Sequence, residues 1–332
     1  MNGTPKNDEA RCGAHAPQRQ RAFCAADIKS GTLKAAGVVK TAPGTPATAA
    51  VNKRLFPVYS AFLFYPAFLI LMLSGCATHA SLQTVYYDIP PHSGNDTPLV
   101  IALISDLHSD IYGKDQTPLL NRIKEASPDI IVLAGDIFDN IAGPLGTRLL
   151  LGGIKDTGIP VFYVTGNHEY ESAGFDEMMR ELEDFGVTIL SDTYVLLEVN
   201  GMPLLIAGVE DPDKNLRDSS YAPSYTIFNE IYAVDAYKIL ICHRPEIAKL
   251  YYGFDLKLSG HTHGGQIRLP PLINGLYSPG QGLFPKYSGG LYETGNGLLV
   301  VSRGLTTRRP LLPRIFNPPE LVVIRLGGYN EK

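Results

Sequence analysis

The sequence predicts an α/β fold with two β-sheets, and three observations lead to this prediction. Short apolar, β-branched runs alternate with helical patterns in the first half of the folded region, as in parallel sheets covered by helices. Further apolar runs follow with less helix between them, which predicts a second, mixed sheet. Polar and ionisable residues stand directly after several of these runs, at the predicted strand ends.

The predicted elements follow one another in a regular order. The first half supplies strands at residues 98–104, 130–133 and 161–164, with covering helices at 119–126 and near 149–154. The second half supplies strands at residues 204–209, 238–242, 256–259, 298–302 and 321–325, which we assign to the second sheet. No internal repeat is evident, so one domain accounts for the folded part.

Charge and cysteine spacing exclude several function classes. The 332-residue chain has a net charge of −4, and no basic run with interleaved aromatics predicts a nucleic-acid partner. The cysteines lack the close spacings of a zinc knuckle or a redox pair; they are Cys12, Cys24, Cys76 and Cys242. Neither disulfides nor thiolate metal sites are implied.

Composition divides the chain into four segments. Residues 1–50 are rich in Ala, Gly, Thr and Pro without apolar periodicity, so we expect a disordered extension or a mis-assigned translation start. Residues 51–76 are expected to form a signal peptide or membrane anchor, and residues 77–97 a linker. The catalytic domain is expected at residues 98–328.

The second segment predicts contact with a bacterial membrane. Lys53-Arg54 precedes the nearly uncharged apolar residues 55–73, and Leu73-Ser74-Gly75-Cys76 resembles a bacterial lipobox. One expectation is a lipoprotein that starts at an acylated Cys76, with Val51 as an alternative start codon. The other is an uncleaved signal anchor, because about 18 apolar residues just span a bilayer. In both cases the positive-inside tendency places the catalytic domain outside the cytoplasm.

The candidate ligands all follow predicted strands. Five strand ends carry them: Asp106-Leu107-His108, Gly135-Asp136-Ile137-Phe138-Asp139, Gly166-Asn167-His168-Glu169, His243, and Gly260-His261-Thr262-His263. The carboxyl edge of an open α/β sheet is where sites assemble. Each motif alone is weak, because Gly-Asp often caps a helix and Gly-Asn-His can form an ordinary turn. Five such motifs in this order, each directly after a predicted strand, predict one shared site.

The residue types favour two divalent metal ions. Carboxylate and imidazole ligands suit manganese, iron or zinc, and no strand end carries a thiolate. A shared carboxylate is needed to hold two ions about 3.5–4 Å apart, and Asp136 is best placed to bridge them. Glycines before Asp136, Asn167 and His261 are expected to relieve crowding where a strand turns into a loop.

The ordered motifs resemble the calcineurin-like metallophosphoesterase superfamily over about residues 99–326. The resemblance implies an αββα sandwich of two packed mixed sheets. It implies one metal held by Asp106, His108, Asp136 and His263, and another held by Asp136, Asn167, His243 and His261. His168 would lie over the phosphate as a catalytic acid or charge stabiliser, with Asp139 as its orienting partner.

The resemblance also implies a reaction. A metal-bridging hydroxide would attack phosphorus in line, without a covalent enzyme intermediate. Ser302-Arg303-Gly304 and Asn317-Pro318-Pro319-Glu320 look most like a bacterial exported or membrane-associated branch of phosphodiesterase-like members. Protein Ser/Thr phosphatases carry Gly after Asp-x-His and Arg-Gly after Gly-Asp-x-x-Asp, where this chain has Ser109 and Asn140-Ile141. We therefore expect diesters or pyrophosphates as substrates rather than phosphoproteins.

Three alternatives bear on the function. A lipid-linked substrate, such as a UDP-2,3-diacylglucosamine pyrophosphate bond, suits an anchored enzyme, although an exported enzyme would not meet cytoplasmic UDP-sugars. A non-catalytic scaffold would be expected to have lost ligands, and here every position is present. A Ser/His/Asp hydrolase is excluded because the chain lacks a Gly-x-Ser-x-Gly elbow.

The remaining candidate residues are expected to have structural roles and not catalytic ones. His15, His79 and His92 are expected to be solvated, and Cys242 to be a buried thiol that faces away from the metals. Arg244 and Arg303 are expected to form surface salt bridges, with pairing to a substrate phosphate as the alternative. The tyrosines and phenylalanines of residues 221–232 and 251–252 are expected mainly in the core, with a lining for an acyl or aromatic substrate group as the alternative.

Overall fold

A computed structural model describes residues 81–90, 98–307 and 313–327. The predicted N-terminal extension and membrane segment lie outside these residues, as do His15, His79 and His92. Among the helices that the structure describes, none combines the length and the apolarity needed to cross a bilayer.

The first sheet has six strands in the order β1-β14-β2-β3-β4-β5. Strand β14 runs antiparallel to β2, and the other neighbours are parallel. The sheet comprises β1 (Gln83–Ile89), β2 (Leu99–Ile104), β3 (Ile130–Ala134), β4 (Val161–Val164), β5 (Thr188–Ile189) and β14 (Glu320–Leu326). Every residue of β2, β3 and β4 is buried, as expected of parallel strands covered on both faces.

The second sheet also has six strands, in the order β12-β13-β9-β8-β7-β6. Its central strands are parallel, and the outer strands β6 and β12 are antiparallel to their neighbours. The sheet comprises β6 (Thr193–Val199), β7 (Met202–Gly208), β8 (Tyr237–Ile241), β9 (Leu256–Ser259), β12 (Gly290–Glu293) and β13 (Leu298–Val301). Both sheets are therefore mixed.

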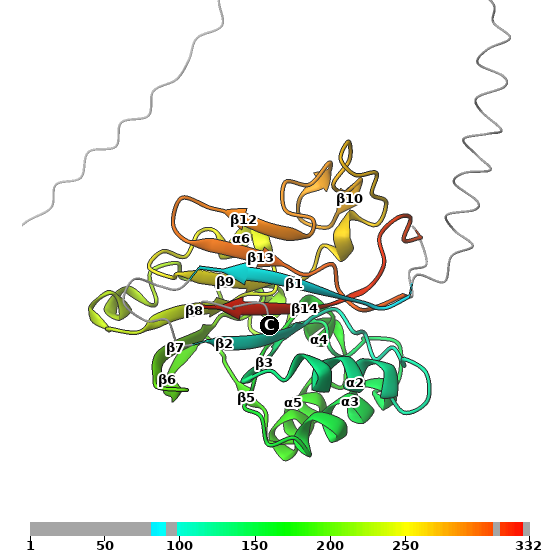
Figure 1. The fold of residues 1–332 in the computed structure, drawn as a ribbon, viewed down its shortest axis with the longest axis horizontal. Coiled ribbons are helices and arrows are strands. Elements are labelled where there is room, and N and C mark those ends of the chain that lie inside the picture. The colour runs from blue at the N-terminus through cyan, green and yellow to red at the C-terminus, as the bar shows by residue number, and fades with distance from the viewer. Residues whose placement is uncertain (1–80, 91–97, 308–312, 328–332) are drawn as a thin grey trace, which may run out of the picture. The chain divides into compact units, whose positions relative to one another are not determined.

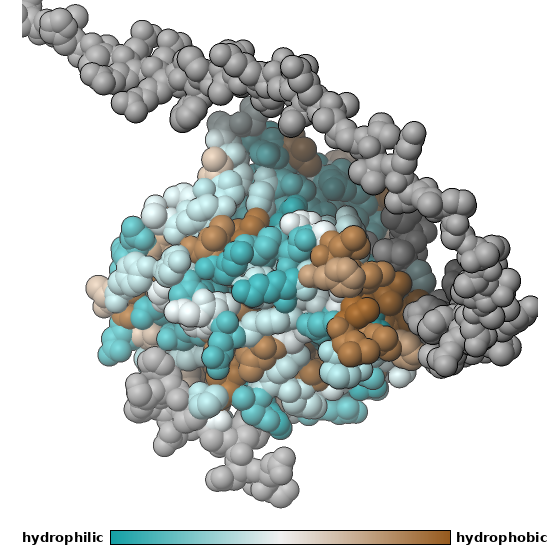
Figure 2. Space-filling view, turned by 90° about the horizontal axis from the view of Figure 1, so that it is seen from above, coloured by the Kyte–Doolittle hydropathy of each residue, from teal (hydrophilic) through white to brown (hydrophobic). Residues whose placement is uncertain are grey.

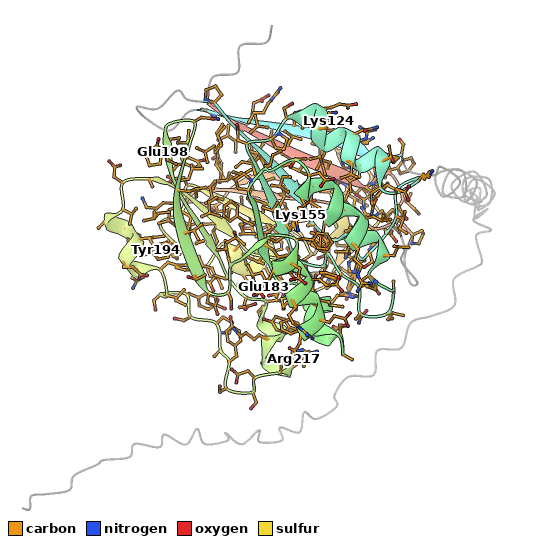
Figure 3. The ribbon with its side chains drawn as sticks, turned by 90° about the horizontal axis from the view of Figure 1, so that it is seen from below. Lys124, Lys155, Glu183, Tyr194, Glu198 and Arg217 are labelled. Atoms are coloured by element: carbon orange, nitrogen blue, oxygen red, sulfur yellow. The ribbon has the colours of Figure 1, made fainter. Side chains whose placement is uncertain are left out.

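The helices cover the outer faces of the packed sheets (Figure 1). Helices α2 (Thr117–Ala126), α3 (Leu145–Lys155) and α5 (Phe175–Asp184) cover the first sheet. Lys124, Lys155 and Glu183 mark their solvent-facing sides (Figure 3). The short helix α4 (Asn167–Glu171) follows β4, and α6 (Pro245–Ala248) follows β8. The remaining elements are short: η1 (Pro212–Leu216), η2 (Asn229–Ala233), η3 (His263–Gly265), β10 (Tyr277–Ser278) and β11 (Gly282–Leu283).

Three hydrophobic cores produce this layering. Alternate strand residues such as Ile101 and Ile239 pack between the two sheets. The intervening residues of the first sheet, such as Ala102, pack against its helices. Residues such as Leu240 fill the outer face of the second sheet, together with Tyr251. The predicted fold of two mixed sheets flanked by helices is confirmed.

Two details of the predicted organisation are wrong. Residues 83–89 were expected in a linker, but they form β1 and pair in parallel with β14 from Gln83↔Glu320 to Ile89↔Leu326. Strand β1 is a half-exposed edge strand, so it lacks the continuous apolar run that revealed the central strands. The last predicted strand returns as β14 to the first sheet, because the chain crosses back beside β2.

Candidate metal centre

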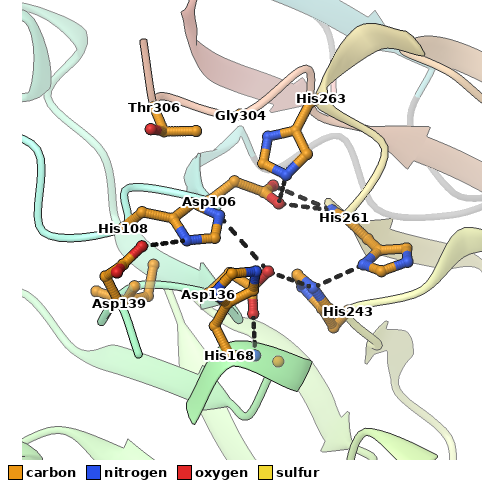
Figure 4. A network of polar contacts seen from close by, with 12 residues as sticks. Asp106, His108, Asp136, Asp139, His168, His243, His261, His263, Gly304 and Thr306 are labelled. Carbon is orange, nitrogen blue, oxygen red and sulfur yellow. Dashed lines mark hydrogen bonds and ion pairs between the residues drawn. The ribbon is translucent and has the colours of Figure 1, made fainter. Parts of the chain in front are cut away.

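The strand ends of both sheets converge on one buried cluster (Figure 4). Strands β2, β3 and β4 of the first sheet lead directly into residues 106–108, 136 and 167–168, and strands β8 and β9 of the second lead into residues 243 and 261–263. Loops from different strands support one another: Asp106 N donates to Gly135 O at 3.1 Å, and Gly260 N donates to His243 O at 3.0 Å. The sandwich thus brings the predicted ligands together.

The backbone at this cluster is strained. The predicted ligands with left-handed φ angles are Asp106 (50°), His108 (47°), Asp136 (52°), His261 (69°) and His263 (47°). A non-glycine residue in a sparsely populated part of this backbone region destabilises the fold by on the order of 1–3 kcal/mol. Such residues are concentrated at functional sites. The surrounding sheets hold a ligand geometry that the isolated loops would not adopt.

Two glycines make room for the ligands, as predicted. A Cβ atom on Gly135, whose φ is +80°, would lie 2.5 Å from His243 Nδ1. A Cβ atom on Gly166 would lie 2.2 Å from Asp136 Oδ1. Any side chain at either position would displace a ligand, so glycine is required there for space.

The first ligand group consists of Asp106, His108, Asp136 and His263, whose donor atoms all lie within 4.8 Å of one another. His108 Nε2 lies 3.6 Å from Asp136 Oδ2, and His263 Nε2 lies 3.5 Å from Asp106 Oδ1. All four side chains are buried. This group is the set predicted for the first metal.

The second ligand group consists of Asp136, His243 and His261, within the same 4.8 Å limit. His243 Nε2 lies 3.2 Å from Asp136 Oδ2 and 3.2 Å from His261 Nδ1. On the other side of the ring, His243 Nδ1 lies 2.8 Å from the Ala134 carbonyl oxygen, which accepts from it. In the neutral ring that hydrogen bond directs the Nε2 lone pair toward the cluster, as is usual for a ligating histidine.

Two buried polar atoms show that the second group fits a metal ion. Asn167 Oδ1 and His261 Nε2 are both buried and have no hydrogen-bond partner among the described residues. An unsatisfied buried polar atom costs about 1–3 kcal/mol. A divalent cation bound by the amide oxygen and the imidazole nitrogen would satisfy both atoms.

The electrostatics of the cluster favour a cation. Burial would lower the pKa of His243, but Asp136, with help from Asp106 and Asp211, raises it to about 10. Burial also acts to raise the pKa of Asp136, but His243 outweighs it and holds that pKa well below its usual range. The pKa of His261 is lowered well below its usual range by burial and by the adjacent His243. The carboxylates thus stabilise positive charge here.

Asp139 lies beside both His108 and His168, and the donor atoms of these three residues lie within 4.8 Å of one another. Asp139 was predicted to orient His168, and its Oδ2 atom lies 3.2 Å from Nδ1 of the candidate ligand His108. His168 Nδ1 lies 3.0 Å from Asn140 Oδ1. The Asn140 amide is itself oriented, because its Nδ2 atom donates to Glu171 Oε2 at 2.7 Å. Asn140 is thus a partner of His168 that the sequence did not indicate, and Asp139 contacts a candidate ligand.

Glu169 is a site residue to which the sequence assigned no role. Its Oε1 accepts from the backbone N–H groups of Ile137 and Phe138 at 2.7 and 3.1 Å. Its Oε2 accepts from those of Asp136 and Gly166 at 3.0 and 2.9 Å. Burial and the nearby Asp136 raise the pKa of Glu169 to about 7, against the effect of these donors. One carboxylate thus joins the loops after β3 and β4.

Replacing Glu169 by Gln is expected to lower the free energy of unfolding by about 2–5 kcal/mol, because the amide NH₂ would face backbone donors and leave them unsatisfied. Urea unfolding followed by circular dichroism measures this change. The matched control is Glu183→Gln on the exposed face of α5 (Figure 3), which should alter stability by less than about 0.5 kcal/mol. Equal stability of the two variants would contradict the assigned role.

The C-terminal motifs hold the ligand loops. Asn317 Nδ2 donates to the carbonyl oxygens of His263 and Gln266 at 2.7 and 3.2 Å. Gly304 packs directly on Asp106, since a Cβ atom there would lie 2.6 Å from Asp106 Cβ. In the sequence, the motifs that contain these residues resembled one branch of the superfamily and suggested no role for the residues themselves. In the structure, these residues hold the loops that carry Asp106 and His263.

Several structural interpretations from the sequence are confirmed in part. Arg244 forms a bidentate ion pair with Asp211 at 2.7 and 2.8 Å, and Arg303 pairs with Glu320, but both acidic partners are buried, so these are not the surface pairs expected. Cys242 is a buried free thiol in the outer core of the second sheet, and burial raises its pKa far above the usual range. The expectation for the aromatic residues is only partly right: Phe228 and Tyr251 are buried in the same core, whereas the exposed ones are Tyr225, Tyr232 and Tyr252.

Comparisons with known proteins identify the family of the chain. The model of the calcineurin-like phosphoesterase family matches residues 99–265. An uncharacterized metallophosphoesterase of Aquifex aeolicus is 29% identical over 269 residues, which cover 78% of this chain and 98% of that protein. The uncharacterized metallophosphoesterase Cj0846 of Campylobacter jejuni is 30% identical over 288 residues, which cover 82% of this chain and 68% of that protein.

One relative is described as a transmembrane protein. A Bos taurus protein described as a transmembrane protein with metallophosphoesterase domain is 28% identical over 225 residues, which cover 61% of this chain and 50% of that protein.

Together, the matched family model and the bacterial relatives show that the chain belongs to the calcineurin-like phosphoesterase family and is a metal-dependent phosphoesterase.

Proposed function

We propose that the protein is a binuclear metal-dependent hydrolase of phosphodiesters or pyrophosphates. The observation that carries this proposal is the shared position of Asp136, which belongs to both buried ligand groups. One ion would be held by Asp106, His108, Asp136 and His263, and the other by Asp136, Asn167, His243 and His261. Bound ions would supply Lewis acidity toward the phosphoryl oxygens and the attacking water.

His168 is proposed to act on the leaving group. Its ring stacks edge-on against His108, with 4.4 Å between ring centroids, so it borders the first ligand group. Glu171 fixes the Asn140 amide, so Asn140 Oδ1 accepts from the Nδ1–H group of His168. The protonated ring would donate through Nε2–H to the oxygen that leaves phosphorus.

Chelation is expected to inactivate the enzyme, and manganese is expected to restore more activity than magnesium. The proposed shell contains four imidazoles, whereas magnesium prefers oxygen ligands and keeps several waters. Turnover of bis-p-nitrophenyl phosphate after EDTA treatment and metal addition measures this, with bound metal quantified in parallel. Activity with magnesium alone would contradict the proposed ligand set. Full metal content without turnover would favour a scaffold.

Diesters are proposed over phosphoproteins as substrates. The positions where protein Ser/Thr phosphatases carry Gly and Arg-Gly hold Ser109 and Asn140-Ile141 here. Ser109 Oγ bonds with Thr147 Oγ1 at 3.1 Å, and Asn140 is committed to His168 and Glu171. Neither offers the guanidinium that would pair with a phosphomonoester. A lipid-linked pyrophosphate is the second candidate, favoured by the apolar residues 55–73.

The functional protein is proposed to sit at a bacterial membrane with its catalytic domain outside the cytoplasm. N-terminal mass spectrometry of the membrane fraction is expected to find a mature chain that starts at an acylated Cys76. An intact segment 53–73 would identify a signal anchor instead. A chain that retains Met1 and is recovered without membranes would contradict both forms.

A further inference from the structure

We propose that the loop containing β10 and β11, residues 267–289, is a docking surface for an anionic lipid bilayer and holds the active-site edge against it. The inference rests on the proposed membrane location and extends it from a tether to a contact made by the catalytic domain. This loop contains none of the candidate metal ligands.

The loop exposes large apolar side chains. Leu272 is 80% exposed, Leu283 67% and Phe284 65%, and Tyr277 is also exposed. Figure 2 shows hydrophobic residues gathered on one side of the face seen from above, the side on which Figure 1 places β10. Exposed apolar residues that gather in this way mark interaction or membrane sites, whereas single ones are ordinary.

The charges around these side chains suit an anionic surface. Glu293 is the sole acidic residue of the sequence between Asp255 and Glu320. Within residues 267–289 the charged residues are Arg268 and Lys286, both basic; Lys286 is exposed and Arg268 is half-buried. The whole chain is negative, with a net charge of −4, so this basic stretch is a local feature. Basic residues beside exposed apolar ones are typical of segments that bind anionic lipid.

Hydrogen bonds hold the loop in this conformation. Phe284 N donates to Leu276 O at 2.8 Å, and Gln281 bonds both the N–H and the carbonyl of Tyr287, at 3.0 and 2.9 Å. Because Gln281 and Tyr287 close the turn around Leu283 and Phe284, these side chains are presented on an ordered loop. Little conformational entropy remains to be lost on docking.

The loop is also joined to the metal centre. Leu276 N donates to Gly265 O at 2.9 Å, and Thr262 Oγ1 donates to Ser288 O at 3.1 Å. Gly265 and Thr262 flank the candidate ligand His263. A bilayer that contacts the loop would therefore lie beside the site, where a substrate held in the membrane could reach it.

The point where the chain enters the domain lies at the same edge. Gln83, the first residue of β1, donates through its backbone to Pro319 O at 2.9 Å and accepts from Arg303 at 3.4 Å. Arg303 in turn packs against Gly289 at the end of the loop. Residues 77–82 span at most about 20 Å when extended. A membrane tether that ends at Cys76 thus keeps this edge close to the bilayer.

Single tryptophans test the proposal, since the chain has no Trp of its own. The full-length Phe284→Trp and Tyr252→Trp variants are reconstituted with vesicles of brominated phosphatidylcholine and phosphatidylglycerol. The two positions are matched in exposure, 65% and 62%. Tyr252 precedes β9, at the edge opposite the metal centre. We expect a blue shift and bromine quenching at position 284 and neither at position 252.

The other outcomes overturn the proposal. Equal quenching at both positions, or none at position 284, removes the docking surface. A blue shift at position 284 without bromine quenching points to a second protein copy instead of lipid. Removing phosphatidylglycerol should reduce the quenching. None of these readouts requires turnover, so failure of the proposed hydrolysis would leave them unaffected.

A double variant tests whether the two exposed apolar side chains contribute to lipid binding, with the Tyr277→Trp chain that lacks these changes as its control. The Leu283→Ser/Phe284→Ser double variant should keep its activity on soluble bis-p-nitrophenyl phosphate. Its quenching response, read from Tyr277→Trp in the same chain, should require roughly tenfold more lipid. An unchanged lipid requirement would contradict a role for these two side chains in docking.

Discussion

Replacement of Asp136 by Asn is expected to abolish phosphodiester hydrolysis and to remove metal from both proposed positions. Asp136 is the carboxylate common to the two ligand groups, and its Oδ2 atom faces both His108 and His243, at 3.6 and 3.2 Å. An amide lacks the charge that holds two cations close together. The loss in turnover should be on the order of 10³-fold or more.

Metal analysis of the purified variant decides this prediction. Asp136→Asn should contain far less than the two ions per chain expected of the parent. Asp184→Asn, an exposed change at the end of α5, should keep both metal and activity. A fully metallated and active Asp136→Asn protein would show that Asp136 is not a shared ligand.

The central fold and the positions of the candidate ligands could be predicted because both depend on local patterns. Strands β2, β3 and β4 are buried on both faces, so they are continuous apolar runs in the sequence. Each ligand directly follows such a run, and the carboxyl ends of parallel strands share one edge. The pattern therefore predicted that Asp106, Asp136 and His261 belong to one site, without knowledge of how the two sheets pack.

Contacts between distant segments could not be predicted in the same way. Strand β1 is defined by its pairing with β14, more than 200 residues later, and its own pattern is half polar. Glu169 bonds to backbone N–H groups, which every residue offers, so its partners leave no trace in the sequence. Asp139 contacts His108, and its neighbour Asn140 contacts His168. These partners depend on how the loop turns after Phe138, because adjacent side chains point in different directions there.

Replacement of His168 by Ala is expected to lower turnover by roughly 10²–10⁴-fold while metal content stays unchanged, as for loss of a general acid or an electrostatic donor. His168 contacts Asn140 through Nδ1 and is grouped with His108 and Asp139, outside the two ligand groups that share Asp136. Asn140→Ala should cause a smaller loss of about 10–100-fold, since the ring remains but its orientation is no longer fixed. His108→Ala is the contrasting control and should lose metal. Turnover of bis-p-nitrophenyl phosphate together with metal analysis separates these cases: a fully active His168→Ala protein would remove its catalytic role, and loss of metal would make it a ligand.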